Sequence, residues 1–164
     1  YNVPMNDIIC GIREFIPDGM RQAAVKIGNF TVIKDCYNAN PTSMRSGLDV
    51  LSLAETDGRR VACLGDMMEL GTISEQAHLN VGALAARSKV DCLITVGERA
   101  KLIAQGAKDS GMPEDKIFSF DNNDELCAEI GNILKNGDVI LLKASRSMKL
   151  EQVADYMEKI WSKK

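Results

Sequence analysis

Residues 60–97 read RVACLGDMMELGTISEQAHLNVGALAARSKVDCLITVG, and this stretch decides the fold. Its two ends, 60–65 and 91–97, are short apolar runs that finish on glycine, a pattern typical of buried strands. Between them, 74–87 carries apolar residues at helical spacing, and Ser74 is predicted to cap that helix. Strands that are apolar on both faces and joined by an amphipathic helix indicate a parallel β-α-β unit.

The same alternation of strands and helices extends along the rest of the chain. Downstream, the pattern predicts a helix over 98–109, a strand over 117–120, a helix capped by Asp121 or Asn123, a strand over 139–143 and a last amphipathic helix from about residue 150. Upstream, it predicts a short helix over 7–15, a hairpin with arms 23–27 and 30–34, and a helix that begins at Asn40-Pro41. The expected fold class is α/β: a Rossmann-like, doubly wound, mostly parallel sheet with helices on both faces.

The composition is that of an ordinary globular domain. Of the 164 residues, 45% are hydrophobic and 26% charged, and the formal net charge is −3. This balance argues against nucleic-acid binding, which needs a basic face, and no apolar run approaches the ~18 residues of a membrane span. No signal peptide is recognisable, so we expect a cytoplasmic protein. Because the chain opens on Tyr1 rather than Met, we expect an excerpt of a longer protein.

The cysteines, the single histidine and the absent motifs exclude several kinds of site. Five widely spaced cysteines without a C-x-x-C pair argue against a disulfide framework or a zinc site and favour thiols in the core. His78 is the only histidine, so we expect neither a catalytic triad nor a multi-histidine metal site, and we assign no metal ligand in this chain. Neither a G-x-x-x-x-G-K-[ST] phosphate loop nor a G-x-G-x-x-G fingerprint is present, which argues against a self-contained ATPase or a dinucleotide oxidoreductase.

Three loops that follow predicted strands carry polar residues suited to chemistry. The first, 35–44, reads DCYNANPTSM, in which Asn40 and Pro41 are typical of a helix start. Capping leaves Asp35, Tyr37 and Asn38 unexplained. A carboxylate at a strand end is suited to bind ribose hydroxyls. Two interpretations of this loop therefore remain open, a ligand site or a simple turn with a helix cap.

The second loop, 65–71, reads GDMMELG and precedes the helix that carries His78. Asp66 and Glu69 are suited to hold an ammonium group or a metal ion, and the alternative is a solvated loop whose apolar residues pack inward. His78 lies one turn into the helix, as either a base or, more simply, a polar packing residue.

The third loop, 143–149, reads KASRSMK and gathers three cations and two hydroxyls where the last helix begins. Such a group suits a carboxylate or a phosphate. The alternative is a solvated basic loop in which Ser147 caps the helix.

These strings, taken in order, resemble the carboxyl-terminal domain of the Mur ligase family. The resemblance runs from about Phe15 to the end of the chain and rests on Y-N-A-N-P, on G-D-M-M-E-L-G, on His78 and on Lys143-Ala144-Ser145-Arg146. Where the family commonly has Lys-Gly-Ser-Arg, this chain has Ala144, which counts against a very close approach of backbone to ligand there.

The resemblance implies a part of a three-domain, ATP-dependent amide-bond ligase of peptidoglycan precursor synthesis. Residues 1–30 would be the tail of the central ATP-binding domain and its linker, and residues 31–164 the carboxyl-terminal domain. The implied reaction adds D-Ala-D-Ala to UDP-MurNAc-tripeptide through an acyl phosphate. The phosphate loop and the Mg²⁺ ligands would lie in the central domain, so this fragment alone is expected to be inactive.

The resemblance also implies roles for ten side chains. Those on the nucleotide side are Arg21 at the ATP phosphates, Asp35 at the ribose, and Tyr37, Asn38 and Asn40 along the cleft. Those on the dipeptide side are Asn38 and Asn40 again, Ser145 and Arg146 as binders of the carboxylate, and Asp66, Glu69 and His78 as residues that shape the pocket or receive the amine. An Arg in such a position suits a carboxylate, which its guanidinium grips with two parallel hydrogen bonds.

Two other classes of function stay open at this point. One is a standalone regulatory module that binds a nucleotide or a small anion, and the other is a structural interaction domain. The sheet alone cannot separate them, because this fold hosts many functions. The ordered motifs favour the ligase.

Overall fold

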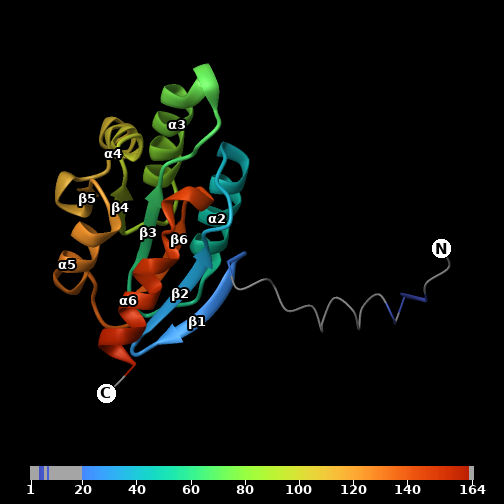
Figure 1. The fold of residues 1–164 in the computed structure, drawn as a ribbon, viewed down its shortest axis with the longest axis vertical. Coiled ribbons are helices and arrows are strands. Elements are labelled where there is room, and N and C mark those ends of the chain that lie inside the picture. The colour runs from blue at the N-terminus through green and yellow to red at the C-terminus, as the bar shows by residue number, and fades with distance from the viewer. Residues whose placement is uncertain (1–3, 6, 8–19, 163–164) are drawn as a thin grey trace.

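The computed structural model describes residues 4, 5, 7 and 20–162. The helix expected over 7–15 lies outside the described residues. In chain order the elements are β1 (Ala23–Ile27), β2 (Phe30–Asp35), α2 (Pro41–Leu53), β3 (Arg60–Gly65), α3 (Ser74–Arg87), β4 (Cys92–Val96), α4 (Ala100–Asp109), β5 (Ile117–Phe120), α5 (Asn123–Ile133), β6 (Val139–Lys143) and α6 (Glu151–Trp161) (Figure 1).

The strands form one sheet in the order β1-β2-β6-β3-β4-β5. All neighbours pair in parallel except β1, which pairs antiparallel with β2 through the predicted hairpin. The turn of that hairpin needs Gly28, whose φ of 55° lies in the left-handed region. The domain boundary expected at residue 30 stays a prediction, although β1 lies before it and pairs along its whole length with β2.

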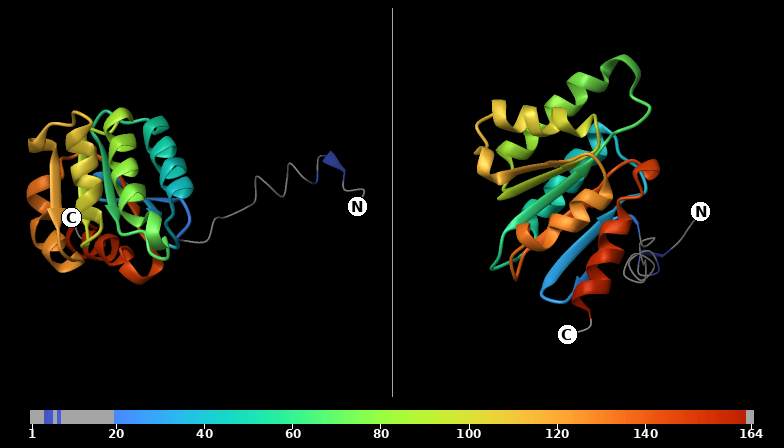
Figure 2. Two further views of the ribbon diagram at one scale, coloured as in Figure 1. Left: turned by 90° about the horizontal axis from the view of Figure 1, so that it is seen from above. Right: turned by 60° about the vertical axis from the view of Figure 1, so that its left-hand side comes forward.

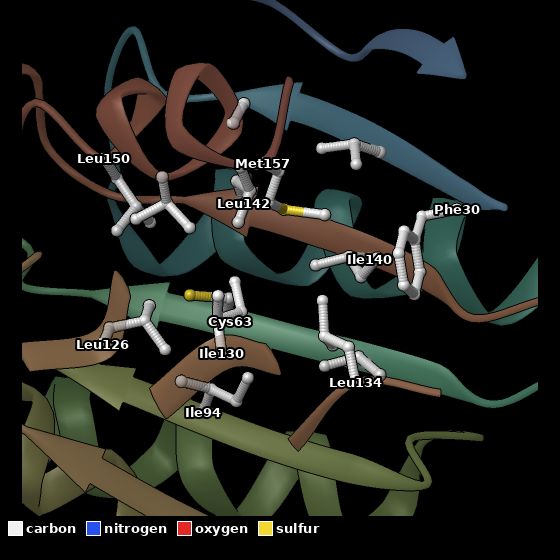
Figure 3. Close-up of a cluster of buried hydrophobic side chains, with 14 of the residues drawn as sticks. Phe30, Cys63, Ile94, Leu126, Ile130, Leu134, Ile140, Leu142, Leu150 and Met157 are labelled. Atoms are coloured by element: carbon white, nitrogen blue, oxygen red, sulfur yellow. The ribbon is translucent and has the colours of Figure 1, made fainter. Parts of the chain in front are cut away.

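Helices cover both faces of the sheet, which confirms the predicted fold class. α2, α3 and α4 pack on one face, around Met44, Val81 and Ile103, and α5 and α6 pack on the other (Figure 2). Figure 3 shows the second of these layers, in which side chains of α5 and α6 meet those of the central strands. β4 and β6 are buried along their whole length, which explains their continuous apolar sequence.

Two predicted helix starts are wrong in detail. Ser74 does not cap α3 with its side chain, because a 3-10 turn at Gly71–Ile73 runs directly into the helix and leaves Ser74 within helical backbone. α5 is capped by Asn122, whose side chain accepts a backbone N–H three residues on, rather than by its neighbours Asp121 or Asn123. Among the described residues, no helix is both long and apolar enough to cross a membrane.

Candidate functional site

The carboxyl ends of three neighbouring strands meet at one edge of the sheet. β2 ends at Asp35, β6 at Lys143 and β3 at Gly65, and β6 lies between the other two. The helices that follow β2 and β3 cover one face, whereas the helix that follows β6 covers the other. Neighbouring connections that leave toward opposite faces define a topological switch point, which is where ligands bind in open α/β sheets. The three polar loops predicted from the sequence are therefore brought together here.

Asp35 forms a buried ion pair with Lys143. The two residues are direct partners in the β2–β6 register, and Lys143 Nζ lies 2.7 Å from Asp35 Oδ2. The same ammonium donates to the carbonyl oxygen of Asn38 at 3.1 Å. The Lys143 side chain is 1% exposed and that of Asp35 is 12% exposed, so one carboxylate oxygen is fixed from inside the protein.

Tyr37 and Arg21 lie together at the surface of this edge. The Arg21 guanidinium carbon is 4.1 Å from the centre of the Tyr37 ring, which is cation–π geometry. The N–H of Tyr37 donates to the carbonyl of Met20 at 3.3 Å and so ties the segment before β1 to the loop after β2. Both side chains are exposed, as a ligand-contacting pair must be.

Asn38 and Asn40 shape the same loop. Asn38 Oδ1 accepts the N–H of Ala39 at 2.7 Å, a local turn contact. Asn40 caps α2 as predicted: its Oδ1 accepts the N–H of Ser43 at 2.8 Å, and the Ser43 hydroxyl lies 3.0 Å from the N–H of Asn40. The capping alternative thus accounts for Asn40, while Asp35 and Tyr37 remain outside it.

Asp66 reaches across to a different helix. It is 5% exposed, and its Oδ1 accepts the N–H of Ala100, the first residue of α4, at 2.7 Å. α4 has no side-chain cap from the residue before it, so Asp66 fills that role from the neighbouring loop. Gly97 makes room for the carboxylate, since a Cβ there would lie 2.5 Å from Asp66 Oδ1.

His78 and Ser145 hold the second loop in place. The N–H of Met67 donates to His78 Nε2 at 3.0 Å, so Nδ1 carries the proton and donates to the carbonyl of Ser74 at 2.7 Å. The ring is fully buried with both nitrogens used, which favours the packing interpretation. Ser145, also buried, accepts the N–H of Met68 at 2.8 Å and donates its own N–H to the carbonyl of Asp66 at 3.0 Å. Two hydrogen bonds therefore tie the loop after β3 to the loop after β6.

Glu69 and Arg146 are the exposed charges of these two loops. Glu69 has a φ of 62°, in the left-handed region, and its side chain lies at the surface. Arg146 is half exposed and pairs through Nη1 with Glu151 Oε1. The second oxygen of Glu151 is buried and has no partner among the described residues, so the guanidinium is held on one side only. Both charges remain accessible to a ligand.

Three cysteines lie in the core of the domain, and their thiols are inert. Burial raises the pKa of Cys36 to about 12, and its thiol donates to the carbonyl of Leu142 at 3.3 Å. Burial likewise raises the pKa of Cys92 to about 11 and that of Cys63 well above its usual value. These three thiols are free and buried, which confirms the interpretation of them as core residues. Within the described part of the chain, no group of three His, Cys, Asp or Glu side chains is placed to hold a metal ion.

Sequence reasoning missed two features of the site. The sequence predicts Lys143 both as the end of a strand and as a cation of the loop that follows, but it does not predict that Lys143 is buried and paired with Asp35. The second feature is Glu151, the partner of Arg146, and the signal for it is its place five residues after Arg146, at the start of an amphipathic helix.

The sequence and the fold are similar to those of known proteins. Residues 20–146 match the family described as Mur ligase, glutamate ligase domain. The UDP-N-acetylmuramoyl-tripeptide–D-alanyl-D-alanine ligase of Bacillus subtilis is 32% identical over 154 residues, which cover 93% of this chain and 34% of that protein. This chain therefore spans about a third of the length of the relatives it matches.

Solved structures of Mur ligases also resemble this chain. MurF from Acinetobacter baumannii superposes with a TM-score of 0.82 and 30% identity, covering 95% of this chain and 34% of that one. MurF from Thermotoga maritima in complex with ADP superposes with a TM-score of 0.73 at 23% identity, covering 89% and 32%. None of these relatives supports the standalone regulatory module. Together with the sequence match, they show that this chain belongs to the Mur ligase family and is its carboxyl-terminal domain.

Proposed function

We propose that this chain is the carboxyl-terminal part of an ATP-dependent ligase that joins D-Ala-D-Ala to UDP-MurNAc-tripeptide during peptidoglycan precursor synthesis. One observation carries the proposal: the D-C-Y-N-A-N-P, G-D-M-M-E-L-G and K-A-S-R loops meet at the switch point of the sheet. Relatives that share this chain's sequence at 30% identity or more bear the name of that ligase. We place the reaction in the cytoplasm, where ATP is available.

On the nucleotide side, Asp35 and the Arg21–Tyr37 pair are the groups suited to ATP. Asp35 Oδ2 is held by Lys143, and no hydrogen bond from a described residue reaches Oδ1, which is left to accept from a ribose hydroxyl. Arg21 is a fixed surface cation beside a ring, which suits the charge of the phosphates. When bound, ATP supplies the phosphoryl group that activates the tripeptide carboxylate; this chain's residues bind and orient it.

On the dipeptide side, Arg146 is the group suited to the free carboxylate. Its guanidinium is half exposed and paired to Glu151 through one nitrogen, so its other N–H groups are available for a second carboxylate. Ser145, the residue before Arg146, is hydrogen-bonded to the backbone of Met68 and Asp66, which holds the start of this loop in place. We assign Asp66 and His78 to shaping the pocket from inside the protein, because both are buried and hydrogen-bonded. We assign Glu69 to the amine of the dipeptide, because it is the exposed acid of the loop after β3.

Two parts of the machinery are expected outside this chain. The phosphate loop is absent from the sequence, and the described residues include no metal cluster. We therefore expect the Mg²⁺ ligands and the phosphate-binding loop in a preceding central domain, and the UDP-sugar contacts in a further one. The relatives, about three times as long, have room for both.

Phosphate release tests the proposal. The full-length protein that contains this domain is mixed with ATP, UDP-MurNAc-tripeptide and D-Ala-D-Ala, each of which is omitted in turn. Release is expected only when all three are present, with L-Ala-L-Ala in place of the dipeptide as the matched control. The 164-residue chain alone is expected to stay at background. Release that does not depend on the dipeptide, or activity of the isolated chain, contradicts the proposal.

A further inference from the structure

The buried Lys143 is not explained by stability. It is among the largest fully buried side chains of the protein, and it ends a strand whose other four residues are all apolar. Lysine is almost never fully buried unless it is paired, and an apolar residue of similar volume is often as stable as a buried ion pair. A charged residue at this position therefore calls for a reason other than packing.

We propose that Lys143 is a positioning residue for the nucleotide site. Its ammonium holds two groups at once, Asp35 Oδ2 at 2.7 Å and the Asn38 carbonyl at 3.1 Å. Together these contacts fix the plane of the carboxylate and the path of the loop after β2. Asp35 Oδ1 is then presented in one orientation to the ribose. This inference rests on the proposed function, because it requires that Asp35 bind the nucleotide.

Gly47 of α2 closes the space around the pair. A Cβ at Gly47 would lie 3.0 Å from Lys143 Cδ, 3.2 Å from Leu141 Cδ2 and 3.7 Å from Asp35 Oδ2. The helix therefore packs directly on the lysine stem, and the ammonium has no room to swing away from the carboxylate. The loop after β2, the end of β6 and α2 are held together at this one point.

The first test measures KM for ATP and for D-Ala-D-Ala in the full-length ligase. Lys143→Met keeps the length of the side chain and removes its charge. We expect it to raise KM for ATP about tenfold or more, the scale on which the loss of an orienting partner weakens a site. KM for D-Ala-D-Ala should change by less than about twofold, since the Lys143 ammonium holds Asp35 and the Asn38 carbonyl rather than the Arg146 side chain. Lys135→Met, at an exposed lysine before the other end of β6, is the matched control and should change neither value.

A double variant separates positioning from a general loss of structure. In an Asp35→Asn background, Lys143→Met should change KM for ATP by less than about twofold, because the carboxylate that it orients is already neutral. The double variant also leaves no unpaired buried charge, so it folds even if that charge destabilises the single variant. An effect of Lys143→Met that is equally large in both backgrounds overturns the positioning role.

Gly47→Ala perturbs the pair without removing either charge. The added methyl pushes the Lys143 stem by a few tenths of an ångström. A misplacement of about 1 Å costs about a hundredfold in reaction rate. On the same scale, a shift of a few tenths of an ångström should raise KM for ATP about threefold. Gly131→Ala, at an exposed glycine of α5 with open space around it, is the matched control.

The outcomes distinguish this inference from the function on which it rests. Ligation by the wild-type enzyme tests the function, and calorimetric titration with ATP tests nucleotide binding separately. An active wild type whose Lys143→Met and Gly47→Ala variants keep their KM for ATP overturns the positioning role alone. A lower kcat together with equal increases in KM for ATP and in KM for D-Ala-D-Ala also overturns the positioning role. A wild type that binds no ATP and makes no product overturns both proposals.

Discussion

Asp66 is predicted to stabilise the domain as a cap for α4 rather than to act in chemistry. Its carboxylate is almost fully buried and accepts the N–H of Ala100 at 2.7 Å. Asp66→Ala removes this acceptor and leaves a buried N–H without a partner. Losing a hydrogen bond to a charged group costs about 1.5–3 kcal/mol, and losing an N-cap about 0.5–2 kcal/mol. Both figures describe the same bond, so we expect a loss of about 2 kcal/mol in the free energy of unfolding.

Asp66→Asn is the matched control for that change. Asparagine keeps an oxygen that can accept the same N–H, and only the attraction between a negative charge and the helix N-terminus is lost. That attraction contributes about 0.3–1 kcal/mol. We therefore expect Asn to cost about 1 kcal/mol or less.

Urea denaturation of the 164-residue chain measures both variants. With a slope of about 2 kcal/mol per molar urea, Asp66→Ala should lower the midpoint by about 1 M and Asp66→Asn by less than about 0.5 M. Equal shifts for the two variants, or a shift below about 0.3 M for Ala, would refute the capping argument. In the full-length ligase, Asp66→Asn should leave KM for D-Ala-D-Ala nearly unchanged; a large rise would instead assign Asp66 to the amine.

Three further predictions concern packing, pH and the dipeptide. Gly82→Ala should lower the free energy of unfolding by more than about 2 kcal/mol, since the new methyl would overlap the Ile103 carbonyl of α4. Gly131→Ala should instead raise the free energy of unfolding by about 0.5–1 kcal/mol, because alanine favours the helix and the space there is open; urea midpoints measure both variants. Because burial raises the pKa of Cys36 from 9.0 to about 12, the unfolded chain loses this proton first. The contribution of Cys36 to stability should therefore be constant below about pH 9 and fall by about 1.4 kcal/mol per pH unit above it, so Cys36→Ala should make the fall in stability less steep by that amount in urea titrations between pH 8 and 11. Arg146→Lys in the full-length ligase should raise KM for D-Ala-D-Ala about tenfold with little change in KM for ATP, because lysine cannot grip a carboxylate with two parallel hydrogen bonds; an unchanged value would remove Arg146 from the dipeptide site.

The strands and the fold class could be predicted because their causes are local. Residues 139–142 are continuous apolar residues, and such a run has few stable uses other than a strand covered on both faces. The hairpin turn at Gly28-Asn29 is likewise decided within the turn. The position of β6 between β2 and β3 could not be predicted, since contacts across more than 70 residues decide it.

The candidate site shows the same division. The three loops could be found because each follows a strand and carries unusual polar residues. The partners of their side chains could not be found, because each partner comes from another loop: Asp35 meets Lys143, Asp66 meets Ala100, and Ser145 meets Met68. Ser74 shows that a local signal can also fail: its side chain is suited to cap a helix, but the 3-10 turn before it continues directly into α3.

The antiparallel direction of β1 decides where the preceding chain joins the domain. A parallel first strand would begin at the amino edge of the sheet, and its five residues would carry that junction about 16 Å from the switch point. Instead, Met20 and Arg21 lie beside Tyr37, at the carboxyl edge. A domain attached there is tethered next to the binding loops, so its effective concentration at them is high. Because the loops lie close to this junction, a rotation of the domain about it would change the direction in which the loops face but would move them only a short distance.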